Sequence, residues 1–146
     1  MNDSLVFPAF NLHLDSFQVT AIYSSLNVRT TILEMLTKET PILNGEILIG
    51  NTDVSKVNLS EVGFLFLNEG FYERLTIVEQ LNLYRKLYNV AEPIQSILRK
   101  VHLEEKRNVR MKKLSYSEQR RVALAKLLIQ NPKLVIIEEP DQNVEL

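Results

Sequence analysis

The chain has 146 residues, of which 45% are hydrophobic, and it contains no cysteine and only two histidines. This length and composition are typical of one soluble domain with its own core, and they exclude a disulfide framework, a thiolate metal site and a histidine metal cluster. Because the formal net charge is −1 and no apolar run approaches the ~20 residues of a membrane span, we expect a cytoplasmic protein and not a free-standing nucleic-acid binder.

The first half of the chain predicts strands and one short helix. Alternating and apolar residues favour strands, and apolar residues at helical spacing before Pro41 favour a helix. An Asn44-Gly45 turn is expected to lead into a further strand. The predicted strands are 10–15, 19–23, 46–50 and 62–67, and the predicted helix is 30–39.

The second half of the chain predicts helices with clear start signals. Thr76 with Glu79, and Ser115 with Glu118, have the spacing of a capping box. They predict helices from 76 to about 88 and from 115 to 130, the second ending at Asn131-Pro132. Pro93 suits the first turn of a helix that runs to about 101. Leu124, Leu127 and Leu128 are expected to form the buried stripe of the last helix.

A short apolar run ends in two carboxylates. Residues 134–137 are large and apolar, which predicts a strand buried on both faces of a parallel sheet. Glu138 and Glu139 follow at the carboxyl end of this strand, where α/β proteins place their sites. The plainer interpretation is that two surface glutamates begin a loop.

Basic residues gather in one part of the chain. Nine of the 17 lysines and arginines lie between Arg99 and Arg121. This cluster is either a solvated face or a surface for an acidic partner or a phosphate. Direct nucleic-acid contact through Lys106 to Arg121 is the weaker interpretation, because aromatic residues are not interleaved.

The order of elements indicates an α/β architecture with a helical subdomain. The stretch "LSYSEQRRVALAKLLIQNPKLVIIEEPDQNVEL" resembles the signature motif, helix and Walker B strand of ATP-binding-cassette (ABC) ATPases, and most of the remaining chain resembles the same family. The resemblance implies a P-loop NTPase-like, mostly parallel sheet with an inserted helical subdomain and without the C-terminal part of the family fold. We expect a single domain over 1–146, with its core at about 1–70 and 117–146 and the helical subdomain at about 71–116.

The clearest departure from the family lies in the phosphate-binding Walker A loop. The three glycines of the family correspond to Tyr23, Leu26 and Val28, and its lysine corresponds to Arg29. Because glycines let backbone N–H groups turn inward around phosphates, we expect a different loop shape and weak or lost nucleotide binding. The two threonines that follow keep hydroxyls for Mg²⁺ and phosphate, although they also suit a helix start. The resemblance places the nucleotide-binding positions at Ser24, Ser25, Asn27, Arg29, Thr30 and Thr31.

The resemblance assigns the remaining site positions as well. Glu139 matches the general base, and Glu138 replaces the Walker B aspartate, so that Thr30 and Glu138 are the metal ligands if Mg²⁺ binds. Leu67 stands where the family has the glutamine of the Q-loop, and Glu145 stands at the aspartate after Walker B. We expect Arg29 to pair with Glu138 or Glu139. The signature-like residues are Leu114, Ser115, Tyr116, Ser117 and Glu118.

Two functions follow from this resemblance. The chain is expected to be a non-catalytic ABC-like module of a longer protein, in the manner of transcriptional regulators with a C-terminal LytTR-type DNA-binding domain. The alternative is the ATP-binding subunit of an ABC transporter that hydrolyses ATP. In either case ATP and Mg²⁺ are the only cofactors implied. The expected partner is a protein: a second ABC-like domain, the membrane subunit of a transporter or a second copy of the chain.

Overall fold

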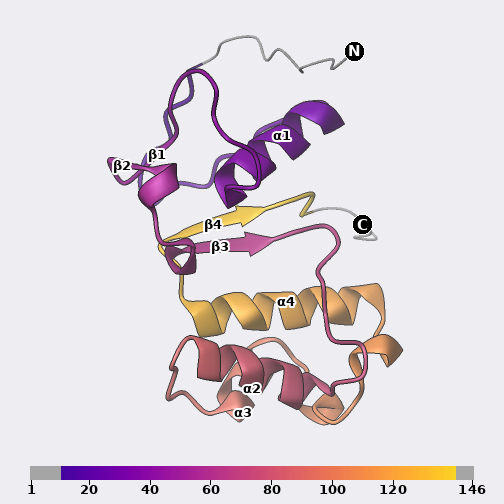
Figure 1. Ribbon diagram of the computed structural model, residues 1–146. Coiled ribbons are helices and arrows are strands. Elements are labelled where there is room, and N and C mark those ends of the chain that lie inside the picture. Colours follow the sequence, from indigo (N-terminus) through magenta and orange to yellow (C-terminus); the bar gives the residue numbers. More distant parts are fainter. Residues whose placement is uncertain (1–10, 141–146) are drawn as a thin grey trace. The chain divides into compact units, whose positions relative to one another are not determined.

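The computed structural model describes residues 11–140, which divide after Val57 into two compact units. Among the described residues, the first unit contains one α-helix and a short hairpin, and the second contains a parallel strand pair and three α-helices (Figure 1). Within residues 11–140, no helix combines the length and the apolar character needed to cross a bilayer.

The first unit is built from α1 (Leu26–Thr37) and the antiparallel strands β1 (Leu48–Ile49) and β2 (Thr52–Asp53). Gly50 and Asn51 connect these strands, and both have positive φ, at 55° and 65°. Two such residues form the tight turn that suits the twist of a hairpin. The side chain of Lys38 ties the end of α1 to the segment after β2, donating to the carbonyl oxygens of Ser55 at 3.0 Å and Val57 at 2.7 Å.

Two predicted strands in this unit are wrong. Residues 11–15 and 19–23 form no strand, while Phe10 lies outside the described residues. The side chains of Val19 and Tyr23 are almost fully exposed, and apolar sequence alone cannot hold a strand without a hydrogen-bonded neighbour. Helix α1 also begins at Leu26, four residues earlier than predicted, and the strand predicted over 46–50 is limited to β1.

The second unit contains a parallel pair of strands, β3 (Val62–Leu65) and β4 (Leu134–Ile137). The presence of both strands and their parallel direction confirm the prediction, although β3 ends two residues earlier than predicted. Burial on both faces of β4 is wrong, because Val135 and Ile137 are each 44% exposed. Gly63 lets β3 pack closely against Leu127 of α4 and Pro132 just after it, since an added Cβ would lie 2.6 Å from side-chain atoms of both.

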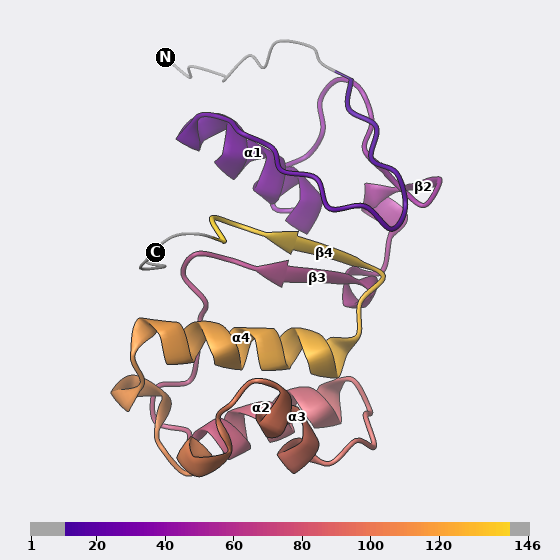
Figure 2. The same cartoon turned by 180° about the vertical axis from the view of Figure 1, so that it is seen from behind.

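Three helices complete the second unit: α2 (Ile77–Leu87), α3 (Ile94–Lys100) and α4 (Tyr116–Gln130). Helix α4 lies between the strand pair on one side and α2 and α3 on the other, as the two opposite views agree (Figures 1 and 2). The main apolar cluster fills the space among the three helices. It consists of Ile77, Leu81, Ile94, Ile97, Leu98, Val101, Leu103, Met111, Leu114, Val122, Ala125 and Ile129.

The predicted buried stripe of α4 is only partly correct. Leu127 is buried, but Leu124 and Leu128 are each 44% exposed. The helix instead buries residues on two sides, because Val122 and Ile129 pack in the helical cluster while Ala123 packs with Leu127 toward β3. A helix covered on two sides has no single apolar stripe.

The predicted start signals of α2 and α4 are confirmed, and the ends of the four α-helices share one feature. Both capping boxes form, at Thr76 with Glu79 and at Ser115 with Glu118. Each of the four helices in the described chain is then followed within two residues by a non-glycine residue with positive φ. These residues are Lys38, Asn89, His102 and Asn131, with φ of 67°, 51°, 55° and 48°.

Candidate functional site

Glu138 and Glu139 stand at the carboxyl end of β4 and have different environments. The Glu138 N–H donates to the Leu65 carbonyl at 3.0 Å, which extends the ladder by one residue. Its side-chain Oε2 accepts from the Leu67 N–H at 2.9 Å. Glu139, the next residue, has φ of 43°, in the left-handed region that favours glycine. Thus the Glu138 side chain is hydrogen-bonded to the segment after β3, whereas Glu139 is distinguished by its backbone conformation.

The loop after β3 is held by charged side chains. Glu69 accepts from the Phe66 N–H at 3.1 Å through Oε1 and from Lys126 Nζ at 2.7 Å through Oε2. This ion pair is largely buried, with 8% of the Glu69 side chain and 15% of the Lys126 side chain exposed. Arg120 donates to the Phe66 carbonyl oxygen and, at 3.5 Å, to the Glu138 carbonyl oxygen.

Together these residues form an end-of-sheet network, which consists of Glu69, Arg120, Lys126 and Glu138 with the backbone of Phe66 and Leu67. Sequence reasoning missed the first three. Arg120 was counted only within the basic cluster. The one available signal was that Glu69 follows shortly after a buried strand, where α/β proteins gather polar residues.

The positions that resemble the Walker A loop lie at the start of α1. Ser24 is exposed and precedes the helix, and Ser25 is its N-cap residue with no side-chain capping bond. Asn27, Arg29, Thr30 and Thr31 lie inside the helix, so the expected helix start at the threonines is wrong. The Thr31 hydroxyl donates to the Asn27 carbonyl at 2.9 Å, a bond typical of threonine within a helix.

This arrangement fits a phosphate group only in part. The first turn of α1 has no acidic residue and no side-chain cap, so its N–H groups are compatible with one anionic group. A regular helix from Leu26 does not wrap successive N–H groups around a triphosphate. Val28, which would be strained in the family's loop, is an ordinary helical residue here. These residues therefore do not form the family's cradle for the phosphates of Mg-ATP.

The residues that resemble the signature motif serve as the start of α4. The Ser115 N–H donates to the Glu118 carboxylate at 2.9 Å, and the Glu118 N–H donates to Ser115 Oγ at 3.3 Å. The Lys106 ammonium and the Ser115 N–H both lower the pKa of Glu118. Leu114 is buried in the helical cluster, and Ser117 is exposed. Within the described chain, the Tyr116 hydroxyl oxygen is buried without a hydrogen-bond partner.

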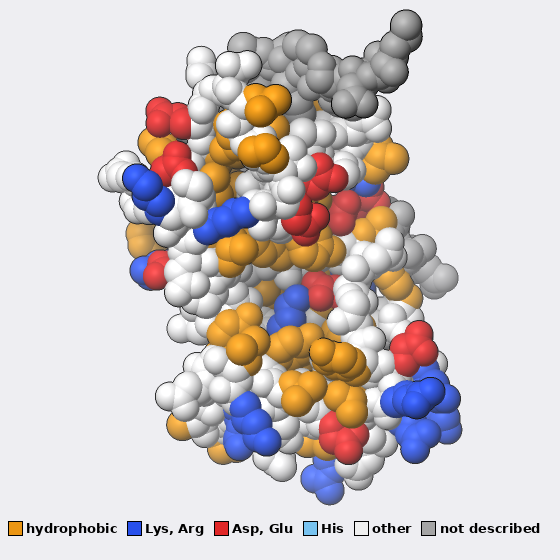
Figure 3. Space-filling view, viewed as in Figure 1, with side chains coloured by type: hydrophobic (Ala, Val, Ile, Leu, Met, Phe, Trp, Pro, Cys, Tyr) orange, Lys and Arg blue, Asp and Glu red, His pale blue; other side chains and the backbone are white. Residues whose placement is uncertain are grey.

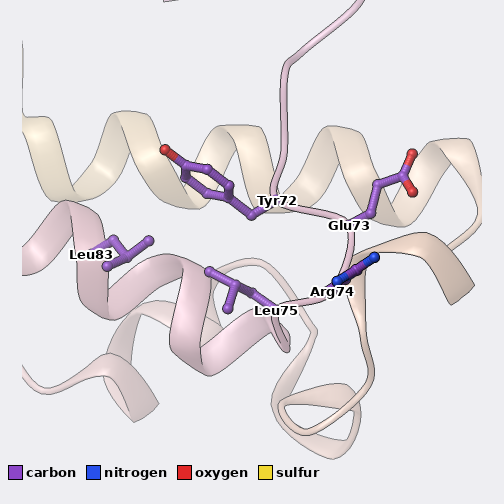
Figure 4. A pocket seen from close by; sticks show the side chains of 5 residues that line it. All are labelled: Tyr72, Glu73, Arg74, Leu75 and Leu83. Atoms are coloured by element: carbon purple, nitrogen blue, oxygen red, sulfur yellow. The ribbon is translucent and has the colours of Figure 1, made fainter.

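Two hollows lie beside these elements. A cavity of about 10 Å³ is lined by Leu67, Glu69, Phe71, Tyr116, Gln119 and Arg120, and it has room for no more than one water molecule. A shallow hollow of about 290 Å³ lies at the start of α2, where Tyr72, Leu75 and Leu83 supply apolar surface and Glu73 and Arg74 complete the lining (Figure 4). Hydrophobic side chains are also exposed over the helices of the second unit (Figure 3).

The structure brings some of the predicted site residues together. Leu67 and Glu138 meet directly, at 2.9 Å. The Walker A positions belong to the first unit and the two glutamates to the second, so the pairing of Arg29 with Glu138 or Glu139 stays a prediction. Glu145 lies outside the described residues.

Residues 29–142 match the family described as "ABC transporter". The chain is 28% identical to the probable ABC transporter ATP-binding protein p29 of Mesomycoplasma hyorhinis, over 95% of this chain and 64% of that protein. It is 29% identical to the lipoprotein-releasing system ATP-binding protein LolD of Rickettsia bellii, over 96% of this chain and 67% of that protein. The maltose/maltodextrin import ATP-binding protein MalK of Yersinia pestis is 26% identical, over 98% of this chain and 41% of MalK.

Solved structures agree with this similarity. Clostridium perfringens cbiO1, described as part of the ABC transporter complex cbiONQ, matches with a TM-score of 0.75 and 20% identity over 93% of this chain and 59% of cbiO1. A putative ABC transporter ATP-binding protein of Pyrococcus furiosus matches with a TM-score of 0.67 and 23% identity, over 80% of this chain and 59% of its own. These similarities confirm the expected α/β, P-loop NTPase-like fold. The chain spans about three fifths of the length of these two structures.

Proposed function

The chain belongs to the ABC transporter family, and from this premise we propose that it serves as the ATP-binding subunit of a membrane transporter, or as part of that subunit. The observation that supports this most strongly is the family match over residues 29–142, which includes three of the six Walker A positions and both glutamates after β4. Relatives that match nearly the whole chain are named as ATP-binding proteins of an ABC transporter, of maltose/maltodextrin import and of a lipoprotein-releasing system. The comparisons give no support to the expected regulatory role with a LytTR-type domain.

The proposed subunit works with a protein partner, namely the membrane subunit of the transporter or a second ABC-like domain. In this role Glu139 is the residue that the family resemblance makes the general base toward the attacking water. The chain's own contribution is to present two carboxylates at the end of β4, of which that of Glu138 accepts a hydrogen bond from the Leu67 N–H.

We further propose that nucleotide binding by this chain is weak. The family's phosphate loop is replaced by regular helix from Leu26, and the lysine position holds Arg29, whose planar guanidinium is not equivalent to a compact ammonium. Phosphoryl transfer depends on positioning and charge stabilisation, and the loss of one such group commonly costs about 10²–10³ in rate. A slow or silent site is the expected consequence.

The thermal midpoint of the chain with and without millimolar Mg-ATP tests the proposal. A ligand present at 100 times its Kd stabilises a protein by about 2.7 kcal/mol, which is easily measured in a chain of this size. We expect a small shift with Mg-ATP and none with Mg²⁺ alone. The variant Glu139→Gln should keep the shift and lose any hydrolysis of ATP. Absence of a shift at every nucleotide concentration would overturn ATP binding by the isolated chain.

The start of α1 at Leu26 favours one second candidate, a non-catalytic ABC-like subunit that works beside a competent partner. This candidate predicts no thermal shift with Mg-ATP and no hydrolysis by the chain alone. Arg29→Lys, which restores the family's cation, discriminates further. Under the first proposal it should raise nucleotide affinity, and under the second it should change nothing.

A further inference from the structure

The two ends of the β3/β4 pair are held by similar chemistry in different surroundings. At the start of β4, Lys133 pairs with Glu61 at 2.7 Å, and the two side chains are 79% and 47% exposed. At the carboxyl end, Lys126 pairs with Glu69 at the same distance, but the side chains are 15% and 8% exposed. Exposed pairs contribute little to stability, whereas removing one partner of a buried pair leaves an uncompensated charge. The second pair therefore has structural consequences that the first lacks.

The buried pair acts on the backbone of the loop after β3. Beyond Leu65 this loop leaves the ladder, so its polar groups need other partners. Glu69 accepts from the Phe66 N–H, Arg120 donates to the Phe66 carbonyl oxygen, and Glu138 accepts from the Leu67 N–H. Arg120 also reaches the carbonyl oxygen of Glu138, at 3.5 Å. Three side chains thus satisfy the loop that lies beside the end of β4.

We propose that Lys126 and Arg120 are positioning residues for the end of β4. Acting through Glu69 and the backbone of Phe66, they hold the loop after β3 where the Leu67 N–H reaches the Glu138 carboxylate. Both cations belong to α4, the helix that begins at the signature-like residues. They therefore hold α4 and the carboxyl end of the strand pair together as one body. Glu138 is in this view a structural hydrogen-bond acceptor. The inference concerns conformation and holds whether or not the chain binds nucleotide.

The test compares Lys126→Met with the matched control Lys133→Met in the full chain. We expect Lys126→Met to lower the thermal midpoint by roughly 10 °C and the control to lower it by about 2 °C or less. The decisive measurement is amide hydrogen exchange at Leu67, whose N–H is hydrogen-bonded to Glu138 and not to Lys126. Its exchange should rise about tenfold more than that of Leu81 in the helical cluster, and Lys126→Arg should restore most of the protection.

A purely local ion pair would give a different result. Exchange at Leu67 would then follow exchange at Leu81 in Lys126→Met, and this result would overturn the positioning role. If Lys126→Met fails to fold, Glu69→Gln provides the same comparison, because it keeps an acceptor for the Phe66 N–H and removes only the charge. The matched control for that variant is Glu61→Gln.

The role of Glu138 has its own test, with Mg²⁺ as the probe and no nucleotide. Glu138→Asp restores the family residue but shortens the side chain by one methylene group, so we expect it to lose the bond to Leu67 and its exchange protection. In the unchanged chain, millimolar Mg²⁺ should leave the Leu67 amide resonance in place. Displacement of that resonance by Mg²⁺ would show the carboxylate leaving for a metal and would overturn the structural role. Failure to bind ATP would affect neither result.

Discussion

Two regions differ in how well the start signals of their helices agree with the burial of their side chains. They are the helical part of the second unit, residues 76–130, and the first unit, residues 11–57. In the helical part, both capping boxes form and apolar residues fill a shared cluster. Its buried Gln80 is hydrogen-bonded too, accepting from the Tyr72 N–H at 3.1 Å and donating to the Tyr84 hydroxyl at 3.0 Å. In the first unit, α1 buries no residue and its N-cap serine makes no capping bond. In the helical part the local start signals and the burial agree, so the sequence of this region specifies its structure more strongly than that of the first unit does.

The largest effect is expected from a substitution within the apolar cluster of the helical part. Leu81 is fully buried, and Leu81→Ala should cost about 2–5 kcal/mol of unfolding free energy because it removes apolar contacts and leaves a cavity. Leu33→Ala in α1, where burial is partial, should cost about 1 kcal/mol or less. Urea unfolding followed by circular dichroism measures both. Leu87→Ala on α2, at a position 72% exposed, is the control. Equal costs for Leu81 and Leu33 would contradict the comparison.

The second largest effect is expected where β3 packs closely against α4 at Gly63. In Gly63→Ala the new Cβ would lie 2.6 Å from atoms of Leu127 and Pro132, so the strand and α4 must move apart. We expect a loss of about 1–3 kcal/mol, the usual cost of overpacking. Gly70→Ala is the matched control, because nothing lies within 4 Å of its added Cβ. A harmless Gly63→Ala in the same unfolding assay would show that this contact yields easily.

A smaller effect compares the helix starts of the two regions. Ser115→Ala and Thr76→Ala each remove a hydroxyl that accepts from a backbone N–H, and each should cost about 1 kcal/mol. Ser25→Ala in α1 should change stability by only a few tenths of a kcal/mol, because that serine makes no capping bond. The three variants are compared by their urea midpoints. A large loss in Ser25→Ala would indicate that its hydroxyl caps α1 in solution.

The smallest effect is a pH dependence of the helical part. The Lys106 ammonium and the Ser115 N–H lower the pKa of Glu118, so the folded state favours the ionised carboxylate. Its contribution is present above the unfolded pKa of about 4.3 and is lost as the pH falls through the folded pKa. Glu118→Gln should therefore flatten the acid limb of stability against pH, and Lys106→Met should flatten it in part. An unchanged acid limb in both variants would rule this contribution out.

The sequence predicts the fold best where the determining interactions are local. The starts of α2 and α4 are confirmed because a capping box is complete within four residues. The strands β3 and β4 are predicted because both are short apolar runs, whereas the pairing of one with the other is seen only in the structure. Residues 19–23 have a similar composition and form no strand, since a strand depends on a neighbour that its own sequence does not contain.

The site was predictable in its location but not in its connections. The resemblance places Glu138 at the carboxyl end of a parallel strand, and the structure brings it to Leu67. The pair of Glu69 with Lys126 joins residues 57 positions apart, and only the packing of α4 beside β3 brings them together. A comparison of motifs identifies residues that act on a ligand, but it does not identify residues that hold the backbone in place.

The residues with left-handed backbone after the four α-helices are positions at which the free energy of unfolding could be raised. Lys38, Asn89, His102 and Asn131 hold a conformation that costs most side chains about 1–2 kcal/mol and costs glycine almost nothing. The four glycines of the chain lie elsewhere. To stabilise this protein one would therefore begin with His102→Gly and leave every buried position untouched, because Lys38→Gly would also remove the two hydrogen bonds that the Lys38 ammonium donates.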